Sequence, residues 1–268
     1  MPTLPAPFWR SIESLHHFIY LVPEARTHYA PTGLKGSWMG YFASRSAALG
    51  TPSPELVIAT FHGFAPRMVH RALPDAGALA SRDDIHEARL GLAREILGRA
   101  VTDEQMAPLA DALTTVVGRL DLAGKSLAAA HASLPVPADV LGRFWHANAV
   151  IREYRGDCHI AVLVAAGLDG AEANVLNVAA SRTFPAQQKL RGWTDDEWAA
   201  AGERLRQRDW LDDAGTITEG GTSARDGLES ATDRACDAGV SDEAADAGTA
   251  IADDLRTAAR ALKESLKG

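Results

Sequence analysis

Apolar residues recur at intervals of three and four along most of the chain, between short polar segments. This spacing places apolar side chains on one face of a helix. Ten segments combine it with strong helix formers: 36–48, 53–72, 82–99, 103–131, 138–154, 158–167, 170–180, 195–208, 221–236 and 241–266. We therefore predict a mostly α fold with little β-structure.

Capping signals mark several of the predicted helix starts. Thr102, Thr194 and Ser241 each precede acidic residues, which favours a helix N-terminus directly after them. Pro135 and Pro137 interrupt the helical pattern and are the best candidates for a domain boundary. The sequence thus predicts an N-terminal half, residues 1–134, and a C-terminal half, residues 135–268.

One segment departs from the helical pattern. Residues 209–221 contain Asp213-Ala-Gly215, a turn signal between two short runs that can pair as a β-hairpin. A helix predicted at 195–208 precedes this hairpin, and another follows it. The order helix, hairpin, helix is typical of winged helix-turn-helix domains, with the wing near 209–221.

The two halves show a weak internal similarity. Residues 38–70 align without gaps to residues 144–176, at a constant spacing of 106 residues. Two later matches preserve the order: Asp83-Asp84 matches Asp195-Asp196 at a spacing of 112 residues, and residues 101–104 match residues 240–243 at 139. The predicted wing of the second copy lies where this spacing increases. The alignment indicates a duplicated unit whose first copy lacks the wing. Chance similarity between alanine-rich helices is the alternative.

The chain also resembles a known family. Trp145-His-Ala147, the segment 152–159 and Arg191-Gly-Trp193 resemble an actinobacterial family of helix-turn-helix proteins that looks like two fused MarR-type protomers. Segments 41–50 and 65–73 are similar to its N-terminal half. The resemblance implies an internally duplicated MarR-like winged-helix pseudo-dimer, either a monomer with pseudo-twofold symmetry or a homodimer. It implies no activity.

One position departs from the family pattern. The family has glycine where this chain has Cys158. A role that requires an unusual backbone conformation at this position is therefore in doubt.

Composition and charge narrow the functional classes. The chain has 46% hydrophobic and 23% charged residues, as soluble globular proteins do. Residues 209–268 contain 6 basic and 14 acidic residues, so this segment alone accounts for the formal net charge of −8. An acidic segment repels nucleic-acid phosphates. No long apolar run is present, and we expect a cytoplasmic protein without a membrane partner.

Sulfur and histidine offer little for metal chemistry. Cys158 and Cys236 lie far apart, and no CxxC pair exists, which excludes a disulfide framework and a thiolate zinc site. The nine histidines include no HExxH motif. We predict no metal site and no cofactor, although a histidine paired across the halves could bind haem.

Aromatic, histidine and arginine side chains are the best candidates for a ligand site. If the halves form a pseudo-dimer, their central helices approach each other, and seven residues can line the cleft between them. These ligand-binding candidates are Trp38, Tyr41, Arg45, His62, Trp145, His146 and Arg152. The alternative is that the same residues form the core between the halves.

Arg152 shares a helix face with Trp145 and is expected to point inward. A buried arginine needs a carboxylate partner or an anionic ligand. Asp157, five residues further on, is the candidate for such a partner.

Two polar residues after this helix are weak catalytic candidates. Asp157 or His159 could transfer a proton while Arg152 holds an anion. Cys158 could act as a nucleophile, but packing explains it more simply. A histidine at the start of a helix is equally consistent with a structural hydrogen bond.

The predicted recognition helix has an unfavourable charge for DNA. Its first turn contains Asp195, Asp196 and Glu197, where a helix-turn-helix protein meets base edges and phosphates. Only Arg204, Arg206 and Arg208 could contact phosphate. DNA binding is therefore doubtful.

These observations favour a small-molecule-binding, MarR-like protein, either a ligand sensor or a sequestration protein, with a degenerate DNA-binding surface. The expected ligand is aromatic or anionic. Three alternatives stay open: a DNA-binding transcriptional regulator, a cofactor-free enzyme acting on a small aromatic or anionic metabolite, and a haem-binding protein.

Overall fold

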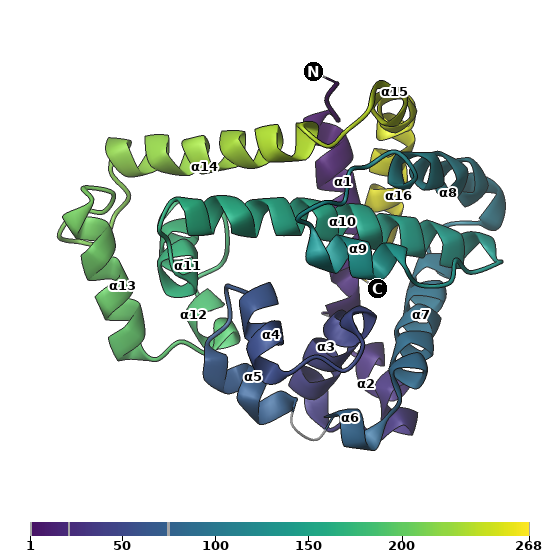
Figure 1. The fold of residues 1–268 in the computed structure, drawn as a ribbon, viewed down its shortest axis with the longest axis horizontal. Coiled ribbons are helices and arrows are strands. Elements are labelled where there is room, and N and C mark those ends of the chain that lie inside the picture. Colours follow the sequence, from purple (N-terminus) through teal and green to yellow (C-terminus); the bar gives the residue numbers. More distant parts are fainter. Residues whose placement is uncertain (1, 21, 74–75, 268) are drawn as a thin grey trace. The chain divides into compact units, whose positions relative to one another are not determined.

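A computed structural model describes residues 2–20, 22–73 and 76–267. These residues form a mostly α fold without strands, as the sequence predicts (Figure 1). The chain divides into two compact units, each built from discontinuous segments. Unit 1 comprises residues 1–52, 75–157 and 236–268, and unit 2 comprises residues 53–74 and 158–235.

Unit 1 contains most of the helices. Its elements are α1 (Ala6–His17), η1 (Phe18–Tyr20), α2 (Glu24–Tyr29), η2 (Ala30–Thr32), α3 (Gly36–Ser46), η3 (Ala47–Leu49), α6 (Ala76–Leu79), α7 (Arg82–Gly98), α8 (Asp103–Val117), α9 (Ser126–Ala132), α15 (Asp242–Ala250) and α16 (Ala252–Ser265). Within this unit α1 packs along α16, and α8 packs along α15 (Figure 1).

Unit 2 is smaller. Its elements are α4 (Pro54–Thr60), α5 (Pro66–Ala72), α11 (Gly170–Ala179), α12 (Gln187–Arg191) and α13 (Asp195–Gln207). Two long helices, α10 (Val140–Ala165) and α14 (Glu219–Asp237), contribute residues to both units. Each unit takes residues from both predicted halves, 1–134 and 135–268, and the relation between those halves stays a prediction.

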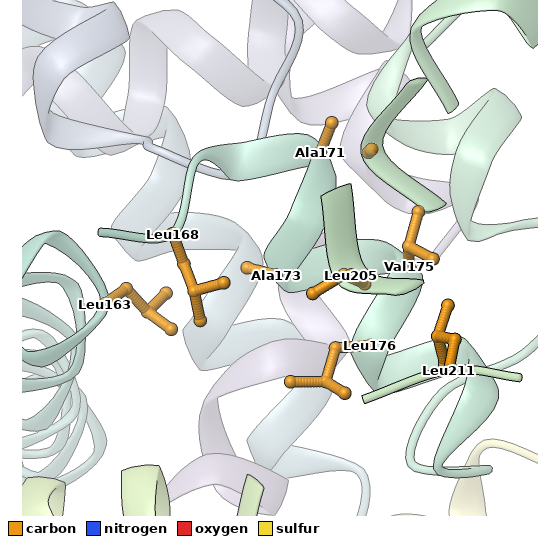
Figure 2. Close-up of a cluster of buried hydrophobic side chains, with 9 residues drawn as sticks. Leu163, Leu168, Ala171, Ala173, Val175, Leu176, Leu205 and Leu211 are labelled. Carbon is orange, nitrogen blue, oxygen red and sulfur yellow. The ribbon is translucent and has the colours of Figure 1, made fainter. Parts of the chain in front are cut away.

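The core of unit 2 forms where α11 packs against α13. Figure 2 shows its buried side chains, which come from the end of α10, from α11 and α13, and from the segment after α13. The apolar face of α13 is short, because only Ala201, Gly202 and Leu205 are buried on it. Three tryptophans, Trp193, Trp198 and Trp210, complete this core from its edge.

The predicted helix caps are confirmed. Thr102 and Thr194 both accept from the backbone N–H three residues later and are both completed by a capping box. Ser241 accepts from the N–H of Ala244 in the same way. These side chains accept hydrogen bonds from N–H groups that have no partner inside the helix. The helices therefore begin at the predicted residues.

Several helix boundaries differ from the prediction. The predicted helices 53–72, 103–131 and 241–266 are each divided in two, and the helices 138–154 and 158–167 form the single helix α10. Pro66 starts α5 because its ring is compatible only with the first turn of a helix. Gly156 does not end α10, since a glycine inside a packed helix costs only about 1 kcal/mol.

The predicted β-hairpin wing is not seen. Leu211 and Ile217 form an isolated antiparallel bridge, and no strand forms among the described residues. Asp209 adopts a left-handed conformation with φ of 58°, directly before the bridge. The hydroxyl of Thr218 donates to the carbonyl of Asp209 at 2.6 Å, and α14 begins at the next residue. Too few residues lie between these two anchors for a ladder to extend.

In the described ranges, no single helix has the length and apolar composition to cross a membrane. The helices α10 and α11 meet these criteria only as a pair, and they are bent by 101° relative to each other.

Candidate functional site

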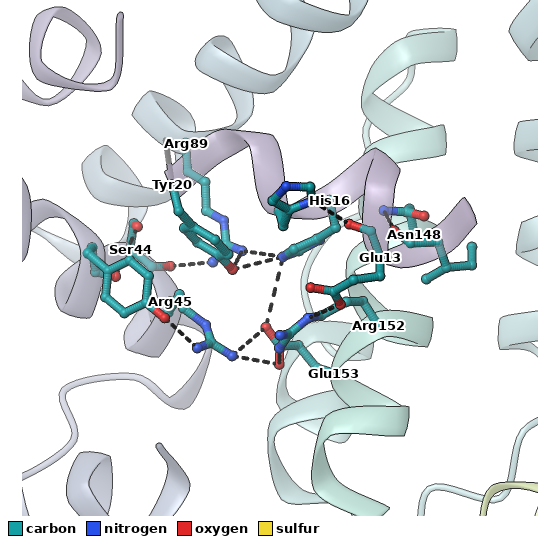
Figure 3. Close-up of polar contacts among 12 residues, drawn as sticks. Glu13, His16, Tyr20, Ser44, Arg45, Arg89, Asn148, Arg152 and Glu153 are labelled. Atoms are coloured by element: carbon teal, nitrogen blue, oxygen red, sulfur yellow. Dashed lines mark hydrogen bonds and ion pairs between the residues drawn. The ribbon is translucent and has the colours of Figure 1, made fainter. Parts of the chain in front are cut away.

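Unit 1 contains a cluster of buried charges with Glu153 at its centre (Figure 3). Glu153 lies on α10, and its side chain is 1% exposed. Nη2 of Arg45 donates to the two carboxylate oxygens at 3.1 and 3.0 Å, and Nη1 of Arg152 donates at 2.7 Å. Burial alone would raise the pKa of Glu153, but the guanidinium groups of Arg152 and Arg45 hold it well below its ordinary value. The carboxylate is therefore ionised inside the unit.

Arg152 has different partners from those expected. Its Nε donates to Glu13 on α1 at 3.1 Å, and its Nη1 donates to Glu153. The proposed pair between Arg152 and Asp157 does not form. Asp157 is five residues from Arg152 and therefore lies about 140° away from it around α10. The buried carboxylate of Glu153 is costly without a cation, and Arg152 supplies one.

Arg89 on α7 is the most unusual member of the cluster. It is 1% exposed, and no carboxylate of the described residues lies within ion-pair distance of it. Nη1 donates to the carbonyl of Ser44 at 2.7 Å, and Nη2 lies 3.3 Å from both the hydroxyl of Tyr20 and Nε2 of His16. Its Nε has no hydrogen-bond partner in the described part of the chain. All acceptors of this buried cation are neutral.

His16 has two polar neighbours at one ring nitrogen. Its Nε2 lies 3.3 Å from Nη2 of Arg89 and 2.8 Å from the hydroxyl of Tyr20. Burial and the charge of Arg89 lower the pKa of His16 well below its ordinary value. His16 is therefore neutral, and the cluster contains three arginines against the two glutamates Glu13 and Glu153.

Aromatic rings surround this cluster. Trp145 stacks on His16 with ring centroids 4.7 Å apart, and the guanidinium carbon of Arg89 lies 5.6 Å from the centre of the Trp145 ring. Tyr41 packs edge-on against Tyr20, and its hydroxyl accepts from Nη1 of Arg45 at 2.8 Å. The aromatic residues thus fix the guanidinium groups in place.

A cavity of about 450 Å³ lies beside the cluster, within unit 1. Its wall includes Tyr20, Tyr29, Tyr41 and Ser44. Apolar side chains between η1 and the start of α3 complete it: Ile19, Val22, Pro23, Ala25 and Leu34. Tyr20 and Ser44 are the same residues that accept hydrogen bonds from Arg89. Burial raises the pKa of Tyr20 to about 12, so its hydroxyl keeps its proton. A molecule in this cavity meets protonated phenols polarised by buried arginines.

The structure gathers only part of the predicted ligand set. Tyr41, Arg45, Trp145 and Arg152 belong to the cluster or its aromatic surround, and Tyr41 also lines the cavity. Trp38 is half-buried and packs against Tyr41 with ring centroids 5.6 Å apart.

Two predicted ligand residues lie outside the cluster. His146 is half-buried on α10, where burial lowers its pKa. His62 belongs to unit 2, and its Nε2 lies 3.0 Å from the carbonyl of Leu168. His146 belongs to unit 1, so the two histidines lie in different units.

The catalytic candidates have structural partners. One carboxylate oxygen of Asp157 accepts from the N–H groups of Leu127 and Ala128 at 2.9 and 3.0 Å, at the start of α9. Burial nevertheless raises the pKa of Asp157 to about 6. Nδ1 of His159 lies 3.1 Å from the hydroxyl of Thr232 in unit 2. Each side chain therefore connects helices, and the proposed catalytic roles stay predictions.

The arginines that could contact DNA are engaged within unit 2. Arg204 pairs with Asp169 and, at 3.3 Å, with Glu172. Arg206 pairs with Glu203 at 2.8 Å. Arg208 donates to two carbonyl oxygens at 3.1 and 2.7 Å. A phosphate would have to compete with these intramolecular partners.

The described residues contain no group of three or more histidine, cysteine or acidic side chains that could hold a metal ion. Cys158 and Cys236 are both buried thiols that form no disulfide. Haem binding through a histidine stays a prediction that these findings do not address.

Five charged or aromatic residues of the cluster were not among the predicted site residues: Glu13, His16, Tyr20, Arg89 and Glu153. Three of them lie in the N-terminal segment, for which no helix was predicted. The signal was present there, since Phe8, Ile12 and Leu15 have helical spacing on the buried face of α1. Arg89 follows Ile85 by four residues and precedes Leu92 by three, so it stands on the apolar face of α7. An arginine at such a position indicates a buried charge.

Comparison with known proteins gives one family. A family model described as a helix-turn-helix family matches residues 6–267. Neither the curated proteins nor the solved structures gave a match.

Proposed function

The chain belongs to a helix-turn-helix family, and from this premise we propose that it is a ligand-binding member of the family, a sensor or a sequestration protein for a small molecule. The proposed site is the cavity beside Tyr20 and Tyr41 in unit 1. The ligand is an aromatic or anionic molecule. In this proposal the DNA-binding surface is degenerate.

Arg89 is the main observation in support. An isolated charge inside a protein is costly unless a counter-charge or several hydrogen bonds compensate it. Arg89 has only neutral acceptors, and the cluster around it has one arginine more than it has glutamates. An anion in the adjacent cavity would place a negative charge near Arg89. Tyr20 and Ser44 lie between the two, because both line the cavity and both accept a hydrogen bond from Arg89.

The size and lining of the cavity agree with a small aromatic ligand. Its volume of about 450 Å³ lies in the range of small-molecule sites, and its wall combines apolar side chains with a few polar groups. Tyrosine rings offer edges and faces for stacking, and their hydroxyl groups are suited to orient a carboxylate or phenol.

The surface of α13 supports the loss of DNA binding. Its first turn contains three acidic residues, and its arginines are paired within unit 2. Nucleic-acid affinity depends mainly on cations that neutralise phosphates. A helix with this charge distribution repels the backbone that it would have to approach.

We also propose that the two halves arose by duplication of a MarR-like unit. The first segment of unit 1 ends at Pro52, and its second segment ends at Asp157. These two boundaries lie 105 residues apart, one residue less than the spacing of 106 found in the sequence. His62 and Leu168 are equivalent under the same spacing, and they contact each other at 3.0 Å. Equivalent residues meet in this way close to a twofold axis.

The ligand proposal is tested on the purified protein. Native mass spectrometry detects a retained small molecule, and calorimetric titration with benzoate, 4-hydroxybenzoate and neutral benzyl alcohol measures affinity directly. We expect the anions to bind, and we expect Tyr41→Phe to weaken binding, because it removes one hydroxyl from the cavity wall. Tyr154→Phe is the matched control, since the hydroxyl of Tyr154 donates to the carbonyl of Cys236 and does not line the cavity.

Two results would contradict the ligand proposal. One is the absence of both a retained molecule and any titration signal. The other is an equal effect of the two tyrosine variants on affinity.

A DNA-binding regulator is the second candidate, because the family match itself favours it. Electrophoretic mobility shift with genomic fragments, measured between 50 and 200 mM salt, distinguishes the two functions. Specific binding that survives the higher salt would favour the regulator.

A further inference from the structure

A second cavity of about 590 Å³ lies in unit 1, where α1 packs along α16. It shares no lining residue with the cavity beside Tyr20, and the proposed function does not use it. Its wall combines an apolar floor with a rim of basic side chains. We refer to it as the α1/α16 groove.

The rim is positively charged on both sides. Arg10 of α1 faces Arg256, Arg260 and Lys263 of α16, and Lys267 follows at the end of the groove. No aspartate or glutamate of the described residues is part of its lining. This concentration of cations stands out in a chain with a formal net charge of −8.

Only part of this charge is neutralised by neighbours. Arg256 pairs with Asp253 at 2.8 Å, and Lys267 pairs with Glu264 at 2.7 Å. Among the described residues, no carboxylate lies within ion-pair distance of Arg10, Arg260 or Lys263. These three side chains leave a positive field across the groove, which attracts an anion.

The floor of the groove is apolar. Phe18 and Leu262 are buried beneath it, and Leu266 is 43% exposed. The exposed Leu266 and the half-buried Pro7 and Ala259 leave hydrocarbon surface of the groove in contact with water. Covering that surface with a hydrocarbon chain is favourable by about 25 cal/mol per Å².

We propose that the α1/α16 groove binds a free single-chain amphiphile with an anionic head group, such as a long-chain carboxylate. The hydrocarbon chain covers Leu266, Pro7 and Ala259, and the head group meets the guanidinium and ammonium groups of the rim. A nucleic acid fits these features poorly, because its phosphates would leave the apolar floor uncovered and the rest of the chain is acidic.

The test uses the full-length protein and dodecanoate below its micelle concentration, with binding measured by calorimetry at pH 7.5. We expect saturable binding of dodecanoate, at least tenfold weaker binding of acetate, and no binding of dodecyltrimethylammonium at the same concentration. Binding of the cation, or equal affinity for acetate, would overturn the proposal, because it requires both the charge and the chain.

Variants locate the binding. The double variant Arg260→Glu, Lys263→Glu should weaken dodecanoate binding at least tenfold, and Leu266→Ser should weaken it about threefold or more. The control double variant Arg71→Glu, Lys189→Glu makes the same charge change at exposed sites outside the groove and should bind as the wild type does. Equal weakening by both double variants would show that only net charge matters and would overturn the assignment.

Two further measurements distinguish binding in the groove from a folding defect and from attachment to a membrane. All substituted side chains are exposed, and circular dichroism should show unchanged helix content and melting temperature within a few degrees. Sedimentation with phosphatidylglycerol vesicles tests a membrane surface as the occupant. Vesicle binding without dodecanoate binding would contradict the proposal, as would full dodecanoate affinity in the groove variants.

Discussion

Arg45 and Glu153 join α3 to α10 through one guanidinium nitrogen that donates to both carboxylate oxygens, at 3.1 and 3.0 Å. Both side chains are buried, and Arg152 completes the arrangement from the other side of the carboxylate. Glu153 thus pairs with two cations, of which Arg45 has no second carboxylate partner in the cluster as Arg152 has in Glu13. The cluster depends on Glu153 more than on any of its other members.

Replacing Glu153 by glutamine should strongly destabilise unit 1. The substitution keeps the volume but leaves Arg45 buried without its carboxylate, which costs about 3–5 kcal/mol of unfolding free energy. Glu13→Gln is the control, because the side chain of Glu13 is 53% exposed and such pairs contribute about 1 kcal/mol or less. Urea unfolding of both variants measures the difference. Similar losses in the two variants would contradict this account.

Replacing Arg89 by methionine should change stability little but weaken ligand binding. The variant loses three hydrogen bonds to neutral acceptors but also removes the desolvation cost of an uncompensated charge. We expect the unfolding free energy to change by about 1 kcal/mol or less, while affinity for benzoate falls. Urea unfolding and calorimetric titration on the same sample check both parts. A loss of several kcal/mol with unchanged affinity would show that Arg89 is structural.

Acid should destabilise the protein below about pH 6.5 through two buried histidines. Burial and the charge of Arg89 lower the pKa of His16 and His131 well below 6.5, so in this range only the unfolded chain takes up their protons. Each histidine then costs about 1.4 kcal/mol between pH 7.5 and pH 5.5. His131→Leu should remove its share of this slope, measured as the change in unfolding free energy between pH 7.5 and 5.5. An unchanged slope would show that His131 is protonated in the folded state.

Asp157 should make the folded protein less stable as the pH rises, whereas the histidines make it less stable as the pH falls. Folding raises its pKa from 3.8 to about 6, so its stabilising contribution is complete below pH 3.8 and is lost as the pH rises through about 6. In Asp157→Asn the amide oxygen can accept the same two N–H groups of α9 without carrying a charge. The stability of this variant relative to the wild type should therefore increase by about 1 kcal/mol from pH 5 to pH 7. A constant difference between the two proteins over this range would show an unshifted carboxyl.

Two glycines of α14 should respond differently to alanine. A Cβ at Gly221 would clash with the carbonyl of Trp210, so Gly221→Ala should cost about 1–3 kcal/mol by forcing the bridge segment away. Gly227 is exposed and has no atom within 4 Å of the added Cβ, so Gly227→Ala should stabilise the helix by up to about 1 kcal/mol. Thermal unfolding of the two variants measures both effects. Destabilisation by Gly227→Ala would contradict the exposed position of this face.

Local signals predicted much of the helical pattern. Thr102, Thr194 and Ser241 mark helix starts through their own side chains, and such contacts lie within three residues of each other. The prediction of a β-hairpin wing was wrong because it rested on the turn signal alone. The turn at Asp213 to Gly215 does form, but the conformation of Asp209 and the start of α14 leave room for one bridge only.

The candidate site depends on contacts between distant segments, which the sequence does not encode locally. Asp157 seemed the natural partner of Arg152 because it is near in the chain, yet the actual partners are the adjacent Glu153 and the remote Glu13. Gly156 lies where the sequence predicts a break between two helices. Instead it leaves space beside Arg152 and Glu153, since a Cβ there would lie 3.5 Å from both side chains. Two local signals were available: the helical spacing of apolar residues in α1, and the position of Arg89 on the apolar face of α7.

The division of unit 1 among three chain segments has a consequence for its synthesis. All residues of unit 2 have been translated once Ala235 is complete, whereas unit 1 still lacks residues 236–268 at that point. The helix α1 packs against α16, so the earliest described helix leaves the ribosome long before its partner exists. Until then its apolar face, with Phe8, Ile12 and Leu15, has no native cover and must rely on transient contacts or a chaperone. A nascent chain that ends at Ala235 and has left the exit tunnel through an added linker would therefore have all of unit 2 available and a protease-sensitive N-terminus.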